Sequence, residues 1–281
     1  MPFTGSRSPV HQLSPDATPL DFFHLLWTPS FFQLLAELYA RQKQARKPNK
    51  KWYATTPQEM MAFVGVNIIM GIDQKPEISS YWSTDEYMGN EGVKKVFPRE
   101  RFELLTRYLH INDSTQMPAV NDPAYDPLYK VRPLVQLCQH TFIEHYVPAR
   151  EMSVDEAMIR YKGRVFFRQY MPKKPIKWGI KVWTLADSKT GFVSNFEVYL
   201  GKKPQSQQAE HGLCTRVVLD LSKPFHHSNR HLYFDNLFNS QVVVEELLKL
   251  GLYACGTLNA NRLPPPLKVG RSSVKIRPGE T

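Results

Sequence analysis

The stretch EMSVDEAMIRY (151–161) marks the point where the chain changes from helical to extended patterns. Two further extended stretches follow it, GIKVWTLAD (179–187) and FVSNFEVYL (192–200). In the second, Phe192, Phe196, Val198 and Leu200 share one face, and the link before it ends in Thr190-Gly191, which is typical of a hairpin. This part of the sequence therefore predicts three consecutive strands that pair antiparallel.

Beyond the hairpin, strands and helices alternate. After a polar loop, the patterns predict a helix over 213–221, a strand over 231–235, a helix over 240–250 and a strand over 252–258. The whole order, β-β-β-α-β-α-β, combines an antiparallel half with a parallel crossover half. We expect an α/β fold: a ribonuclease-H-like mixed sheet in which the first and fourth strands are neighbours.

Toward the amino terminus the patterns are helical. One helix is expected from Pro29, a second from Thr56, a third from Pro98 to Ile111 and a fourth from Pro133 to Pro148, with a long loop over 114–128. Thr56 and Glu59 form a predicted capping box, and the apolar run 60–72 predicts a buried helix. The sequence therefore divides into a loose leader (1–19), an all-helical region (20–148) and a sheet domain (149–262).

The composition points to a polyanionic partner. The chain has 281 residues, a net charge of +10 and a pI near 9.4. Three widely separated cysteines exclude a disulfide scaffold and fit a reducing compartment. The longest apolar stretch is too short to span a bilayer and no secretory leader precedes it, so no membrane partner is expected.

Two carboxylates stand out by position. Asp155 lies within the first predicted strand and Asp235 lies at the carboxyl end of the fourth, where ligands gather in α/β sheets. If those strands are neighbours, the two acids meet, and their hard oxygens suit Mg²⁺ or Mn²⁺. The alternatives are a strand-edge surface residue for Asp155 and a turn or N-cap residue for Asp235. Glu156 is expected to point away from Asp155.

Nine basic side chains fall within 150–181, interleaved with aromatic residues, and six more lie in the run 41–51. Such a mixture neutralises phosphates and offers stacking surfaces, although a solvated linker and a solvated loop are the alternatives. We expect double-stranded DNA to bind through both stretches. Eight side chains of the first are assigned to it: Arg160, Lys162, Arg164, Arg168, Lys173, Lys174, Lys177 and Lys181.

Several short motifs make the sequence resemble the transposase domain of the piggyBac family, in the form found in piggyBac-derived proteins. They are YWS (81–83), RF (101–102), YLHIND (108–113), LYKVRPL (128–134), SVDEAMIRYKGR (153–164), QYMPKKPIKWGIKVW (169–183), DSKTGFVSNFEVYLGK (187–202), LYFDN (232–236) and GLYACGTLNANR (251–262). The resemblance implies metal-assisted DNA excision, insertion at TTAA sites, and three catalytic aspartates, two of which carry over to Asp155 and Asp235. It also implies a nuclear protein whose helical region serves dimerisation, as a homodimer, and DNA binding.

The third aspartate of the family lies in a later W-x-D-type segment, beyond an insertion that follows the GTL-NR motif. We therefore expect residues 263–281 to be the start of a truncated insertion, the sheet to be incomplete at its carboxyl-terminal side, and metal binding to be weak or vestigial. Asp187 and Asp220 occupy hairpin and helix-end positions instead. The interpretations that remain are a catalytically incomplete domain, a non-enzymatic nuclear DNA-binding or interaction protein, and a fragment of an active transposase.

A zinc-dependent nucleic-acid-binding protein is a further alternative. His226, His227 and His231 cluster before the fourth predicted strand, and His211 with Cys214 has ligand-like spacing. A structural zinc site needs four convergent ligands, usually with a second cysteine pair, which this cluster lacks.

Overall fold

The computed structural model describes residues 3, 5, 7–45, 52–201, 212–259 and 262, with the backbone alone for 39–45. The chain forms two compact units: Gln12–Cys138, and Met1–His11 together with Gln139–Thr281. The division falls inside helix α6 (Arg132–Glu144), about ten residues before the domain boundary that the sequence predicts.

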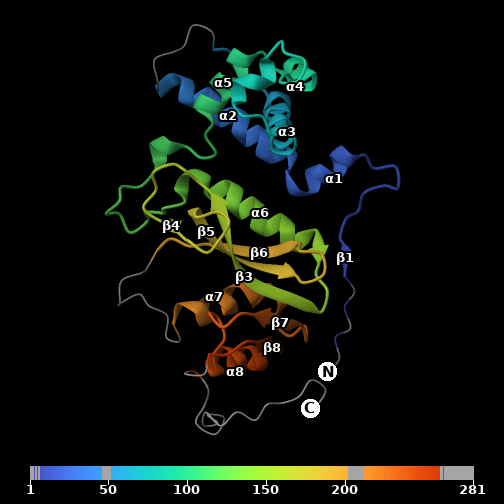
Figure 1. The fold of residues 1–281 in the computed structure, drawn as a ribbon, viewed down its shortest axis with the longest axis vertical. Coiled ribbons are helices and arrows are strands. Elements are labelled where there is room, and N and C mark those ends of the chain that lie inside the picture. Colours follow the sequence, from blue (N-terminus) through green and yellow to red (C-terminus); the bar gives the residue numbers. More distant parts are fainter. Residues whose placement is uncertain are drawn as a thin grey trace. The chain divides into compact units, whose positions relative to one another are not determined.

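The described part of the second unit is built on a mixed sheet of six strands (Figure 1). The strands are β3 (Glu151–Arg160), β4 (Arg168–Tyr170), β5 (Trp178–Asp187), β6 (Val193–Val198), β7 (His231–Phe234) and β8 (Tyr253–Gly256). Their order is β4-β5-β3-β7-β8, with β6 also on β5; β3 pairs parallel to β7 and antiparallel to β5. The predicted ribonuclease-H-like sheet with adjacent first and fourth strands is confirmed. The three-residue β4 was not predicted because it is too short to show a period.

Alternation along the strands builds the core of this sheet. Met152 and Val154 of β3 face the same side as Leu232 and Phe234 of β7, and all four are buried. They pack with helices α7 (Leu213–Ser222) and α8 (Gln241–Lys249), whose buried side chains join the same cluster. Each fully buried aliphatic side chain contributes about 1.5–3 kcal/mol, so this face anchors the strands in register.

Helix α6 contacts the other side of the sheet near the hairpin. The Phe142 ring lies 5.8 Å from that of Phe192 and 6.2 Å from that of Phe196, and the Gln139 amide donates to the Phe196 carbonyl over 2.7 Å. After α6, β2 (Tyr146–Val147) pairs antiparallel with β1 (Ser8–Pro9). The expectation of an unstructured leader over 1–19 is therefore wrong for these residues, whose two-residue strand has no periodicity to detect.

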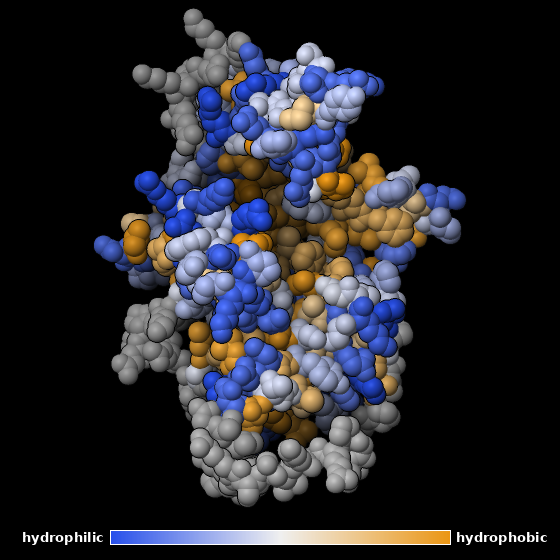
Figure 2. All heavy atoms as spheres, viewed as in Figure 1, coloured by the Kyte–Doolittle hydropathy of each residue, from blue (hydrophilic) through white to orange (hydrophobic). Residues whose placement is uncertain are grey.

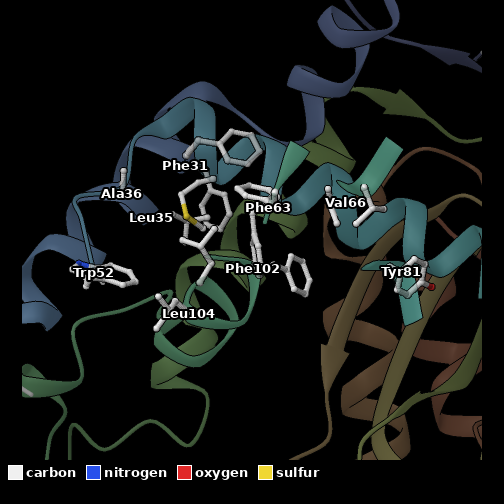
Figure 3. Packing of buried hydrophobic residues seen from close by; sticks show 14 residues of the cluster. Phe31, Leu35, Ala36, Trp52, Phe63, Val66, Tyr81, Phe102 and Leu104 are labelled. Atoms are coloured by element: carbon white, nitrogen blue, oxygen red, sulfur yellow. The ribbon is translucent and has the colours of Figure 1, made fainter. Parts of the chain in front are cut away.

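The described part of the helical unit contains α1 (Pro19–Leu26), α2 (Pro29–Ala45), α3 (Pro57–Ile72), α4 (Glu91–Val96), α5 (Arg99–Tyr108) and the first part of α6. Its core gathers aromatic and aliphatic side chains from α2, α3 and α5 (Figure 3). The expectation that α3 is a buried helix is wrong for much of its surface, because only Met60, Phe63 and Val66 are buried and Ile72 is 82% exposed. Apolar and hydrophilic side chains both appear on the viewed face of the molecule (Figure 2). Within the described residues, none of the helices combines the length and the apolar character needed to cross a membrane.

The predicted capping box at the start of α3 is only half formed. The Thr56 hydroxyl accepts from the Glu59 N–H over 3.1 Å, but the Glu59 carboxylate turns to Arg101 of α5 instead of the Thr56 backbone. The Arg101 side chain is 4% exposed, donates to Glu59 over 2.6 Å through Nε, and stacks 3.6 Å from the centre of the Tyr53 ring. A buried charge-assisted pair therefore joins α3 to α5.

The carboxylate of Asp187 organises the β5–β6 hairpin. It is fully buried and accepts from the N–H groups of Ala149, Lys189 and Thr190 over 2.7, 2.8 and 3.0 Å, and from the Tyr146 hydroxyl over 3.2 Å. Burial alone raises the pKa of Asp187, but these donors together outweigh it and hold the pKa below the usual value of an aspartate. The hairpin is closed by Gly191, whose φ of +73° suits glycine.

Replacing Arg101 by methionine should lower the free energy of unfolding by about 3–5 kcal/mol, because Glu59 would then be left unpaired in a mostly buried position. Urea unfolding followed by tryptophan fluorescence measures the change. The matched control is Arg99→Met, which removes an exposed pair with Glu103 and should cost less than about 1 kcal/mol. Equal effects of the two variants would contradict a structural role for the Arg101 pair.

Replacing Asp187 by asparagine should destabilise the fold at pH 7 by about 1–3 kcal/mol, because three backbone donors lose their charged acceptor. Since the folded-state pKa is depressed, the contribution of Asp187 is present above its unfolded pKa, near 3.9, and is lost as pH falls through the folded pKa. The gap in stability between wild type and variant should therefore narrow below about pH 4. A gap that stays constant from pH 7 to pH 2.5 would refute this; Asp122→Asn, at an exposed turn, is the control.

Candidate metal site and nucleic-acid interface

The two predicted catalytic aspartates follow directly on the last matched pair of β3 and β7. That pair is Val154 with Phe234, and Asp155 and Asp235 are the next residues of the two segments. Neighbouring strands lie about 4.8 Å apart, and side chains at matched positions of parallel strands point the same way. Both aspartates are exposed, and each directly follows a buried residue, Val154 or Phe234.

Each of the two carboxylates is held by a local backbone donor. Oδ1 of Asp155 accepts from the Glu156 N–H over 2.7 Å, and Oδ1 of Asp235 accepts from the Leu237 N–H over 2.8 Å. The second bond shows that Asp235 also has the turn role that was its structural alternative. Because these bonds use only Oδ1, the Oδ2 atom of each carboxylate remains as a further acceptor among the described residues.

The donor set at this position suits a hard divalent cation. Carboxylate oxygens are the ligands that Mg²⁺ prefers, and two of them leave the remaining octahedral positions to water or substrate oxygens. Among the described residues, no group of three or more His, Cys, Asp or Glu side chains gathers to share an ion. Asp155 and Asp235 are thus not joined by a third side chain of this kind among the described residues.

Lys174 places a positive charge beside Asp155 and Glu156. Its Nζ donates to the Glu156 carbonyl over 3.1 Å and lies 3.6 Å from Oε1 of Glu156 and 4.0 Å from Oδ1 of Asp155. The Glu156 side chain is 12% exposed, and its Oε2 is buried with no hydrogen-bond partner among the described atoms. An ammonium group thus partly neutralises the negative charge at this point of β3.

Four of the predicted DNA-binding side chains come together around one pocket. Arg160, Lys162, Arg168 and Lys177 line it with Tyr161, Pro175, Ile176 and Trp178, and its volume is about 540 Å³. The Arg168 guanidinium stacks 4.9 Å from the centre of the Trp178 ring, and its Nη1 donates to the carbonyls of Lys162 and Gly163 over 3.3 Å. These bonds connect Arg168 of β4 to the segment 162–163, so two stretches of chain around the pocket are linked.

The other predicted cations are spread around this region. Nζ of Lys181 lies 5.6 Å from the Trp183 ring and 5.9 Å from the Tyr199 ring, while Arg164 and Lys173 are exposed. The basic run 41–51 begins at the end of α2, and its residues 46–51 lie outside the described part of the chain. The predicted contact of that run with DNA stays a prediction.

The remaining acids near the sheet have structural partners. Asp187 is the buried anchor of the hairpin, and Asp220 bonds Arg216 over 2.9 Å and Lys223 over 2.6 Å. Glu197 also pairs with Arg216, over 2.7 Å. These contacts account for the hairpin and helix-end positions that the sequence assigned to Asp187 and Asp220.

The zinc alternative gains no support from the described residues. His226, His227, His231 and Cys214 are all described, yet they do not form a group of three that could share a metal. His211 lies outside the described residues.

Arg262 holds the turn that follows Asp235, although no pattern in the sequence singled it out for this role. Its Nη1 donates to the carbonyls of Asn236 and Asn239 over 2.9 Å each and to that of Leu237 over 3.2 Å. Asn239 in turn donates to the carbonyl of Gly256 over 2.8 Å. Together they fix the turn that carries Asp235 against the end of β8.

The chain is similar in sequence to a family of transposases and to proteins derived from transposable elements. The family model described as Transposase IS4 matches residues 18–281. The human PiggyBac transposable element-derived protein 3 is 28% identical over 257 residues, which cover 88% of this chain and 42% of that protein. The human PiggyBac transposable element-derived protein 2 is 28% identical, covering 99% of this chain and 46% of that protein. The chain thus spans less than half the length of these two curated relatives.

A solved structure extends the likeness to three dimensions. The chain resembles a piggyBac transposase in a cryo-EM structure of its synaptic complex with hairpin DNA, with a TM-score of 0.80 and 27% identity, over 96% of this chain and 57% of that one. The likeness therefore includes both the helical unit and the sheet. The chain belongs to the Transposase IS4 family of DDE-type transposases, among its piggyBac-derived members, and its sheet has their ribonuclease-H-like fold.

Proposed function

We propose that this chain is a DNA-binding domain of a piggyBac-derived protein, in which Asp155 and Asp235 hold a divalent metal ion. The single observation that carries the proposal is the parallel register of β3 and β7, whose last matched pair, Val154 and Phe234, directly precedes the two aspartates. Two exposed carboxylates side by side repel each other, and a cation between them removes that repulsion. The proposed localisation is the nucleus, where double-stranded DNA is the partner.

Each side chain of the site has a defined part in this proposal. A divalent ion, when bound, supplies the positive charge that activates an attacking oxygen and stabilises a leaving one in phosphoryl transfer. Asp155 and Asp235 would hold it, while Arg262 keeps the Asp235 turn in place. The cations of 150–181 would neutralise the phosphates of the bound strand and steer DNA toward this face.

Strand cleavage by the polypeptide 1–281 is not part of the proposed function. The resemblance assigns two of three catalytic acids to these residues, and the other nearby acids, Asp187 and Asp220, are engaged elsewhere. An absent electrostatic group at a catalytic site commonly lowers the rate by a hundred- to a thousandfold. The second candidate function, a DNA-binding protein without catalysis, is favoured by Lys174, which already partly neutralises the Asp155 site. A homodimer formed through the helical unit is proposed for both.

DNA affinity should fall steeply with salt, with a slope of about −0.9 in log–log form for each phosphate contacted. Changing Lys173, Lys174 and Lys177 to glutamate should weaken binding to every duplex sequence alike, because these contacts involve phosphates. Fluorescence anisotropy with labelled duplexes from 50 to 300 mM KCl measures both effects. The control, Lys189, Lys223 and Lys249 to glutamate, changes the net charge equally on other elements of the same unit. Equal losses in the two triple variants, or an affinity independent of salt, would count against the proposed surface.

Metal binding should depend on both aspartates and be opposed by Lys174. Asp155→Asn and Asp235→Asn should each weaken binding of Mn²⁺, measured by electron paramagnetic resonance of the free ion. Lys174→Gln should strengthen it, because a competing cation 4.0 Å from Asp155 is removed. Lys173→Gln, at the neighbouring exposed position, is the control and should change little. Unchanged Mn²⁺ affinity in both aspartate variants would overturn the proposed site.

The polypeptide 1–281 should not cleave a duplex that bears transposon ends flanked by TTAA, in either Mg²⁺ or Mn²⁺. Gel analysis of end-labelled DNA measures strand breaks, with Asp155→Asn as the control for contaminating nuclease. Robust cleavage that disappears in Asp155→Asn would show that these residues hold a complete catalytic set.

A further inference from the structure

The pocket beside β4 and β5, defined by Arg160, Tyr161, Lys162, Arg168, Pro175, Ile176, Lys177 and Trp178, has a composition that selects its ligand. Four of the eight lining side chains are cationic, two are aromatic and none is acidic. Cations recognise phosphate, and aromatic rings offer stacking surfaces to bases. The chemistry of the pocket therefore matches a nucleotide better than a carboxylate or an apolar ligand.

The size of the pocket favours unpaired over paired nucleic acid as its occupant. A volume of about 540 Å³ corresponds to a cube about 8 Å on a side and lies in the range of small-ligand pockets. A DNA duplex cannot enter such a space, because its major groove alone is about 12 Å wide. A nucleotide that has left the base stack is small enough to enter.

The aromatic wall is both exposed and held in place. Trp178 is 50% exposed, yet its ring lies 4.6 Å from that of Tyr170 on the paired strand and against the Arg168 guanidinium. Tyr161 closes over Gly163, where a Cβ would come within 2.8 Å of three atoms of the tyrosine side chain. The Trp178 ring thus has packing partners before any ligand arrives, which reduces the entropy lost on binding.

We infer that this pocket binds one unpaired nucleotide of a DNA strand, with its base against Trp178 and its phosphate among Arg160, Lys162 and Lys177. The inference rests on the proposed function in one respect, that DNA is the ligand of this surface. It adds a preference: DNA with a gap or a single-stranded overhang binds more tightly than an uninterrupted duplex of the same length and charge.

The test compares three probes with the polypeptide 1–281: an uninterrupted duplex, the same duplex with a three-nucleotide gap, and a single-stranded oligothymidine. Fluorescence anisotropy at one salt concentration measures each Kd. Loss of one stacking contact is expected to weaken binding about 5- to 100-fold. Trp178→Ala should therefore weaken the gapped and single-stranded probes by this factor and leave the duplex within about twofold. Lys162→Gln with Lys177→Gln should weaken the same two probes more than the duplex.

Two controls separate stacking from misfolding and from general charge. Trp178→Phe keeps an aromatic ring and should stay within about threefold of wild type for all probes. Phe166→Ala removes an aromatic side chain that is 70% exposed but outside the pocket, and should leave all three affinities unchanged.

The inference fails if Trp178→Ala leaves gapped and single-stranded binding unchanged, or weakens all three probes equally while Trp178→Phe does not. Failure of the proposed function looks different: the wild type would then bind no duplex, or bind it without salt dependence. Single-stranded binding that depends on Trp178 would still support the pocket in that case.

Discussion

The parallel pairing of β3 with β7 is the constraint on which the sheet and its site both depend. Because side chains alternate along a strand, the burial of Met152 and Val154 opposite Leu232 and Phe234 excludes a slip by one residue, which would turn these side chains out of the core. The same register ends directly before Asp155 and Asp235, which are 80 positions apart in sequence and both exposed. The free energy that holds the acids together therefore comes from apolar contacts on the other face of the strands.

Local pattern was sufficient to predict the strands β3, β5, β6, β7 and β8 and the helices between them, because each is long enough to show its period. It was not sufficient for β1, β2 and β4, which have two or three residues, or for the exposed side of α3, where apolar residues extend around the whole helix. Glu59 shows the limit of local reasoning. Its spacing from Thr56 indicates a cap, but a buried arginine 42 positions away is the stronger partner for its carboxylate.

The candidate site was predictable in its residues and less so in its arrangement. The strand order predicted the two aspartates, whereas the basic stretch 150–181 predicted only a concentration of positive charge. The fold separates that charge into three settings: a pocket around Trp178, an ammonium beside Asp155, and Lys181 against two aromatic rings. Arg262 could not be assigned from sequence, because its bonds to the turn after Asp235 depend on where β8 ends.

The short ladder between Ser8–Pro9 and Tyr146–Val147 has a consequence for biosynthesis. It makes the sheet unit discontinuous in sequence, since the whole helical unit is encoded between its two parts. A ribosome therefore releases the edge residues around Ser8 long before their partner strand exists. The helical unit, all of whose segments are contiguous, can complete its core first. When the helical unit folds first, most of the chain between the two strands of the ladder is already compact. Less conformational entropy is then lost when the ladder forms.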